Sequence, residues 1–115
     1  MSRLLPSYLH TLRKQWGLSQ PELAALLDIS PSGVSRLENL SRRPTAHIIV
    51  ASEVIFGHGV KELFPGFYHA TQHKIVERSR ALYQELEAQP DAASREKLRL
   101  LVELYERADS SAKPV

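Results

Sequence analysis

The stretch GLSQPELAALLDISPSGVSRLEN, residues 17–39, carries the signals of two short helices placed back to back. Ser19 and Glu22 are spaced as a capping box, in which the hydroxyl accepts from the amide three residues on and the carboxylate reaches back. Leu23, Ala24 and Leu27 then form a small apolar face at helical spacing. The first helix of the pair therefore starts after Ser19 and ends near Leu27.

The second helix follows a tight turn at Asp28, where the backbone needs a residue that tolerates the left-handed conformation. Ser30 is a suitable N-cap, and Pro31 suits the first helical position because first-turn amides have no intrahelical partner. Val34 and Leu37 face inward. The outward face keeps small, polar or basic residues: Ser32, Gly33, Ser35, Arg36 and Asn39. Such a face lets the helix approach another surface closely, with Arg36 reaching furthest.

Further short helices flank this pair. Upstream, apolar residues recur every three to four positions around residues 6–16, and Gly17 stands where a left-handed residue ends a helix. These apolar residues are Leu5, Leu9, Leu12 and Trp16. Downstream, Thr45 is the N-cap of the apolar helix AHIIVASEVIF, and KELF forms one more short turn before Pro65 and Gly66. The sequence thus predicts five short helices within residues 1–67.

Residues 68–115 carry two longer amphipathic patterns. The first places Tyr68, Gln72, Ile75, Ser79, Leu82 and Leu86 along one helical face. The second places Leu98, Leu101, Val102 and Tyr105 along another. The intervening QPD looks like a break, with Asp91 or Ser94 as the second cap. These patterns predict a helical hairpin.

A two-helix hairpin has too little core to stand alone, so its apolar stripes must pack against another surface. The residues expected at that interface are Ile75, Leu82, Leu86, Leu98, Leu101, Val102 and Tyr105. The N-terminal part of the same chain, a second subunit or a different protein can cover them. These alternatives are not exclusive, because a hairpin can rest on its own domain and still meet its copy.

Composition narrows the function classes. The 115-residue chain has a net charge of +2 and no cysteine, so it offers no disulfide framework, thiolate zinc site or cysteine nucleophile. The positive excess lies in residues 1–67, with seven Lys or Arg against five Asp or Glu, whereas residues 68–115 hold eight of each. No apolar run is long enough to span a membrane, and no secretion signal is evident. We expect a soluble, cytoplasmic protein.

The sequence contains little that indicates a catalytic function. His69 and His73 are four residues apart and His58 is nearby, but no acidic residue of the metalloprotease kind lies between the pair. No glycine-rich phosphate loop follows a strand. We therefore expect no enzymatic activity, no catalytic residues, no metal site and no cofactor.

Residues 8–65 closely resemble the Xre family, the helix-turn-helix domains of phage Cro and repressor proteins. The resemblance rests on the Gly-Leu-Ser-Gln entry, the Glu-Leu-Ala core, the Ile-Ser turn and the Ser-Arg-x-Glu exit, followed by RRPT, an apolar helix, a glycine and ELF. It implies an all-α fold with a five-helix Cro/repressor-like DNA-binding domain at residues 1–67. The C-terminal helical hairpin, residues 68–115, lies outside the resemblance.

Two departures from the family pattern concern the turn and the second helix of the pair. Asp28 stands where the family most often has glycine, which strains the turn slightly. Pro31 and Ser32 stand where long amides are common among members that contact bases. The operator sequence therefore does not follow from the resemblance.

The resemblance also implies how DNA is bound. In this motif the second helix of the pair lies in the major groove with its N-terminal residues at base edges, while the first crosses the backbone. By position, the base contacts are Pro31, Ser32, Ser35 and Arg36. The phosphate contacts are Ser19, Gln20, Asn39, Arg42 and Arg43. The alternative for each is an exposed polar residue without a role, and for Ser19 the capping bond is a sufficient role.

Arg13 and Glu38 take a structural role by the same resemblance, as an ion pair that joins the first helix to the end of the third. Removing one partner of a largely buried pair leaves the other charge stranded. We expect Arg13→Ala to reduce stability and to affect DNA binding only indirectly.

Two functions follow from these observations. The first is a sequence-specific DNA-binding transcriptional regulator, a repressor from bacteria or a mobile element, acting as a homodimer on a two-fold symmetric operator. The alternative is an antitoxin-like interaction protein, whose C-terminal hairpin binds a protein partner and whose helix-turn-helix autoregulates. A self-associating hairpin favours the first function, and a hairpin whose poor solubility is relieved by a partner favours the second.

Overall fold

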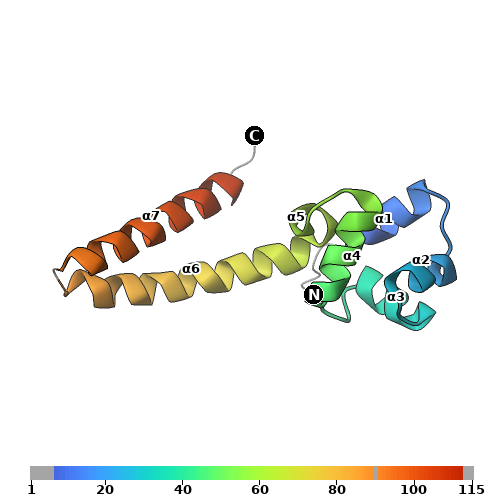
Figure 1. Ribbon diagram of the computed structural model, residues 1–115, viewed down its shortest axis with the longest axis horizontal. Helices are drawn as coiled ribbons and strands as arrows, with labels where there is room; N and C mark the ends of the chain where they lie inside the picture. The colour runs from blue at the N-terminus through green and yellow to red at the C-terminus, as the bar shows by residue number, and fades with distance from the viewer. Residues whose placement is uncertain (1–6, 90, 113–115) are drawn as a thin grey trace, which may run out of the picture. The chain divides into compact units, whose positions relative to one another are not determined.

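The computed structural model describes residues 7–89 and 91–112, which form seven α-helices and no strand (Figure 1). The helices are α1 (Tyr8–Gln15), α2 (Gln20–Leu27), α3 (Pro31–Glu38), α4 (Ala46–Phe56), α5 (Val60–Leu63), α6 (Pro65–Glu87) and α7 (Ala92–Ala112). The all-α prediction is therefore confirmed. No described helix is both long enough and apolar enough to cross a membrane.

The helix starts form as the local sequence dictates. The Ser19 hydroxyl accepts from the Glu22 amide at 3.1 Å, and the Glu22 carboxylate accepts from the Ser19 amide at 2.8 Å. The Thr45 and Ser30 hydroxyls cap α4 and α3 by accepting from the amides of Ile48 and Gly33. Asp28 adopts φ 59° and ψ 47°, the left-handed conformation that the turn between α2 and α3 requires. The predicted caps and the predicted turn are thus confirmed.

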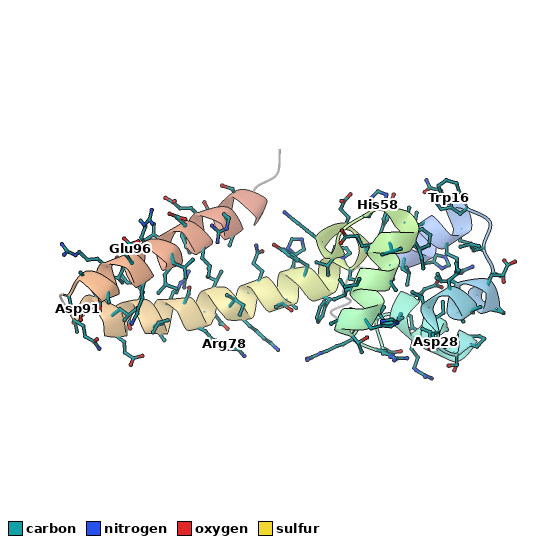
Figure 2. The ribbon with its side chains drawn as sticks, in the orientation of Figure 1. Trp16, Asp28, His58, Arg78, Asp91 and Glu96 are labelled. Atoms are coloured by element: carbon teal, nitrogen blue, oxygen red, sulfur yellow. The ribbon has the colours of Figure 1, made fainter. Side chains whose placement is uncertain are left out.

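Two helix boundaries differ from the sequence-based expectation. Pro65 does not end a segment but begins α6, because a proline has no amide to lose in the first turn of a helix. At the other end of the N-terminal part, α1 stops at Gln15. Trp16 therefore does not continue the apolar stripe: its side chain is 73% exposed and points outward (Figure 2). The first residue of that predicted stripe, Leu5, lies outside the described residues.

One core holds α1 to α5 together. It contains the buried side chains of Leu9, Leu12, Leu23, Ala24, Leu27, Val34, Leu37, Ile48, Leu63 and Phe64. Within it, α3 packs against both α1 and α2, and α5 packs against α1 and α4. Phe67, in the first turn of α6, also packs against this core. Because α3 is buried along one side only, its other side stays available at the surface.

The chain divides into two compact units, Met1–His69 and Ala70–Val115. This division falls two residues after the boundary expected at residue 67. Helix α6 is continuous across it. The second unit is the predicted hairpin, with Asp91 at the turn between α6 and α7 (Figure 2). Asp91 caps α7 by accepting from the Ser94 amide at 2.7 Å. That hydrogen bond lowers the pKa of the Asp91 carboxyl.

The hairpin buries few side chains. Ser79, Leu86, Ser94 and Leu101 are buried, and two of these four are serines. Of the seven residues expected at an interface, Leu86 and Leu101 are thus already covered, and Leu98 is half-buried. The other four remain 40% to 46% exposed: Ile75, Leu82, Val102 and Tyr105. The predicted apolar stripes are therefore only partly satisfied within the hairpin.

Candidate nucleic-acid interface

The outer side of α3 is small and polar. Pro31, Ser32, Arg36 and Asn39 are exposed, and Ser35 is half-buried. Gly33, which the helical pattern predicts on this outer side, is instead buried, because the side chains of Arg42, Ser30 and Ile29 lie against it. The surface that can meet a ligand is therefore narrower than the helical pattern suggested.

The first turn of α3 is held by hydroxyl groups. The Ser30 hydroxyl accepts from the Gly33 amide at 3.0 Å and lies 3.1 Å from the Ser32 hydroxyl. This cap fixes the end of the helix that carries Pro31 and Ser32. Two short side chains on a fixed first turn let a partner approach the α3 backbone closely.

The other end of α3 is tied to both preceding helices through Glu38. Arg13, on α1, donates to the Glu38 carboxylate through Nε at 2.6 Å and Nη2 at 3.2 Å. Gln20, at the start of α2, donates from its side-chain amide at 3.2 Å. His10, on α1, lies 3.1 Å from the same carboxylate. The ion pair expected between Arg13 and Glu38 is present, and Gln20 and His10 extend it into a four-residue cluster.

This cluster keeps Glu38 ionised. Burial of the Glu38 carboxyl by itself raises its pKa, since desolvation penalises the charged form. Hydrogen bonds from Arg13, His10 and Gln20, together with the positive charge of Arg13, outweigh burial and lower the pKa below its ordinary value. The only acidic residue within α3 is therefore neutralised by an inward partner and does not repel a polyanion.

The chain leaves α3 through a left-handed turn. Leu40 has φ 64°, and the Ser41 amide donates back to the Arg36 carbonyl at 3.0 Å, as in a Schellman motif. Asn39 accepts from the Ser41 amide and hydroxyl through the same oxygen, at 3.0 and 2.7 Å. Because both hydrogen bonds use Asn39 Oδ1, the side-chain N–H groups of Asn39 are available to an outside partner.

Two arginines follow this turn. The Arg43 side chain is exposed, whereas Arg42 is half-buried against α3. Together with Arg36 they place three guanidinium groups on α3 and on the residues directly after it. Guanidinium groups bind phosphates and guanine edges through paired donors. The arrangement suits a phosphate-rich partner with a grooved surface.

Some features of this surface were not foreseen from the sequence. His10 carries no local signal that connects it with Glu38, which lies 28 positions away. The left-handed conformation of Leu40 could not be predicted either. The residue that usually adopts it after a helix is glycine, and this position holds leucine. Among the described residues, no cluster of three or more His, Cys, Asp or Glu side chains could hold a metal ion.

Comparison with known proteins bears on this surface directly. A family model described as Helix-turn-helix matches residues 9–56, which contain nearly all of α1 and the whole of α2, α3 and α4. Neither the curated proteins nor the solved structures include a match to the chain. The matched segment contains α3, the capped turn before it and the two arginines after it.

Proposed function

We propose that the chain, a DNA-binding transcriptional regulator with an Xre-type helix-turn-helix domain at residues 9–56, is a repressor. It binds a two-fold symmetric operator as a homodimer. The observation that carries the proposal is the exposed face of α3, which is small, free of unpaired acidic charge and tipped by Arg36.

The face of α3 supports direct contact with bases. In a helix-turn-helix the N-terminal part of the second helix lies at the base edges. Pro31, Ser32 and Ser35 supply small contacts there, and Arg36 can donate two hydrogen bonds to guanine O6 and N7. A bidentate contact of this kind discriminates against other bases by about 1–3 kcal/mol.

Phosphate contacts set the register of the helix on DNA without selecting a sequence. Gln20, Asn39 and Arg43 are proposed for this role. Asn39 and Arg43 are exposed, and the half-buried Gln20 has a second amide N–H beyond the one that it donates to Glu38. Ser19 also faces solvent, although its hydroxyl already caps α2. Each neutralised phosphate contributes about −0.9 to the slope of log K against log salt, so a few such contacts bind weakly at physiological salt.

A second copy of the chain is proposed to cover the hairpin. Ile75, Leu82, Val102 and Tyr105 expose large apolar surfaces on a unit that buries little of its own. A copy presents the same surface, so a symmetric interface buries both sets at once. Two linked half-sites then gain affinity through effective concentration, which compensates for the weak binding of one domain.

The test of DNA recognition is selection of bound fragments from a randomised double-stranded pool, read by sequencing. We expect a two-fold symmetric motif for the wild type and loss of a guanine preference in each half for Arg36→Ala. Arg99→Ala is the matched control, because Arg99 is an exposed α7 residue whose partners among the described residues are Glu96 and Glu103 of its own helix. A wild type that enriches no motif would contradict the proposed function.

The test of association is the molar mass in solution by light scattering, with and without Leu82→Glu. A charge on an apolar contact separates the subunits, so we expect a dimer for the wild type and a monomer for the variant. Leu26→Glu is the control, because Leu26 is also an exposed leucine but lies on α2. A monomeric wild type whose exposed apolar hairpin residues are buried only when a different protein binds would support the antitoxin-like alternative instead.

A further inference from the structure

Gly33 is the third residue of α3, and its backbone does not explain why it is glycine. Its φ is not in the left-handed region, where only Gly17 and Gly57 among the described glycines lie. A glycine inside a helix is less favourable than alanine, because it loses more backbone freedom on folding. The reason for a glycine at this position is therefore space rather than conformation.

The space beside Gly33 is occupied by an arginine from the turn after the helix. A Cβ added at Gly33 would lie 3.0 Å from Arg42 Nη1, 3.3 Å from Ser30 Oγ and 3.4 Å from Ile29 Cδ1. The closest of these atoms is the end of a long, flexible side chain. An alanine would consequently displace the Arg42 guanidinium before it moved any backbone.

Polar contacts within the described residues do not account for the position of this guanidinium. No carboxylate or carbonyl among the described residues pairs with Arg42 in a salt bridge or hydrogen bond. The first turn of a helix also carries partial positive charge, which disfavours a cation there. The half-buried Arg42 guanidinium therefore keeps its donors available to an anionic or acceptor-rich partner from outside.

The first turn of α3 is the end of the helix expected to meet base edges, so the acceptors nearest to this guanidinium would be those of a base. Pro31 and Ser32 are the exposed residues on this turn, and neither has a long donor. The Arg42 guanidinium, which lies across the same turn, can supply the paired donors that a guanine edge accepts. This role differs from the phosphate contact that the family resemblance implies for the same residue.

We infer that Arg42 contacts a guanine in the major groove and that Gly33 is the positioning residue that leaves room for its guanidinium across α3. The inference rests on the proposed function, since it concerns the same DNA surface. It adds to that function a base contact by a residue that follows α3 in the chain. It also gives Gly33 a role in sequence specificity although Gly33 does not itself contact DNA.

The experiment is the selection from a randomised pool, repeated with Arg42→Ala, Gly33→Ala and the double variant, together with affinities for the selected site. Arg42→Ala should abolish one guanine preference per half-site and weaken binding to the selected site by about tenfold or more. Gly33→Ala should reduce the same preference to a smaller extent. In the Arg42→Ala background, Gly33→Ala should change neither the motif nor the affinity, because no guanidinium remains to be displaced.

Two controls separate this role from general effects. Gly59→Ala makes the same chemical change at a glycine that has nothing within 4 Å of an added Cβ, and it should leave binding unchanged. Arg43→Ala removes a neighbouring exposed guanidinium and should weaken binding to all sequences about equally, with a shallower salt dependence. Thermal unfolding of Gly33→Ala should match or exceed that of the wild type, since alanine is the better helix former.

The outcomes are distinct. Equal loss of affinity for all sequences in Arg42→Ala would place Arg42 on phosphate and overturn the inference. An effect of Gly33→Ala that persists at full size in the Arg42→Ala background would overturn the positioning role. Both leave the proposed function intact, because the wild type still selects a motif. A wild type that selects nothing contradicts the proposed function and the inference together.

Discussion

Arg13 Nε donates to the Glu38 carboxylate across 2.6 Å and thereby joins α1 to the last residue of α3. Each of these residues is 6% exposed. The same guanidinium also donates to the Leu18 carbonyl at 2.8 Å, in the segment between α1 and α2. One side chain therefore ties α3 both to α1 and to the segment between α1 and α2.

Arg13→Ala is expected to lower the free energy of unfolding by about 3–5 kcal/mol, because it leaves the buried Glu38 carboxylate without its charged partner. Chemical denaturation measures this change. Lys14→Ala is the matched control: Lys14 is an exposed cation on the same helix, and its removal should cost less than about 0.5 kcal/mol. Equal stability of Arg13→Ala and the wild type would refute the structural role.

The pH dependence of stability should report the same cluster. The pKa of Glu38 is lowered in the folded protein from its ordinary value of 4.5, so the folded state binds its proton less readily than the unfolded state. The stabilisation by the Glu38 carboxylate is therefore complete at pH values above its ordinary pKa, and it is lost as the pH falls through the lower pKa of the folded protein. Chemical denaturation at pH values from 7 to 3 should show that the difference in free energy of unfolding between the wild type and Glu38→Gln becomes smaller toward acid pH. A difference that stays constant over this range would contradict the assignment.

Leu40 carries backbone strain, because a non-glycine residue pays a steric penalty at φ 64°. Leu40→Gly is expected to raise the free energy of unfolding by about 1 kcal/mol, since relief of that penalty exceeds the added freedom of the unfolded chain. Leu40→Ala keeps the Cβ and should show no gain. Identical melting curves for the two variants would argue against strain at this turn.

Ser52 is fully buried on α4, and its hydroxyl has no hydrogen-bond partner among the described residues. Ser52→Ala is expected to stabilise the protein by about 1 kcal/mol, because it removes an unsatisfied polar atom and adds helix propensity. Ser79→Ala is the comparison, since the Ser79 hydroxyl donates to the Val76 carbonyl at 2.7 Å and its loss should bring no such gain. A loss of stability in Ser52→Ala would indicate that the hydroxyl has a partner.

The local parts of the fold followed from residues close together in the chain. The capping box of Ser19 and Glu22, the Ser30 cap and the left-handed turn at Asp28 each form within four residues, so their geometry is set by short-range hydrogen bonds. The same holds for Asp91 at the start of α7. The helical periodicity also identified the core positions of α2, because a buried face repeats every three to four residues.

The hairpin shows where periodicity stops being informative. The pattern grouped Leu82 and Leu86 on one apolar face, yet Leu86 is buried and Leu82 is 44% exposed. Only the way α6 and α7 pack decides which part of a broad apolar stripe is covered. A helical pattern fixes which residues share a face but not how much of that face one neighbouring helix can reach.

The sequence by itself determined the seven-helix order in outline, the caps, the turn inside the helix pair and most of the core, because those depend on residues within a few positions of one another. Only the tertiary structure brought His10 to Glu38 and laid Arg42 over Gly33. It also turned Trp16 to solvent. These contacts depend on how helices cross and where loops return, and no spacing along the chain encodes that geometry.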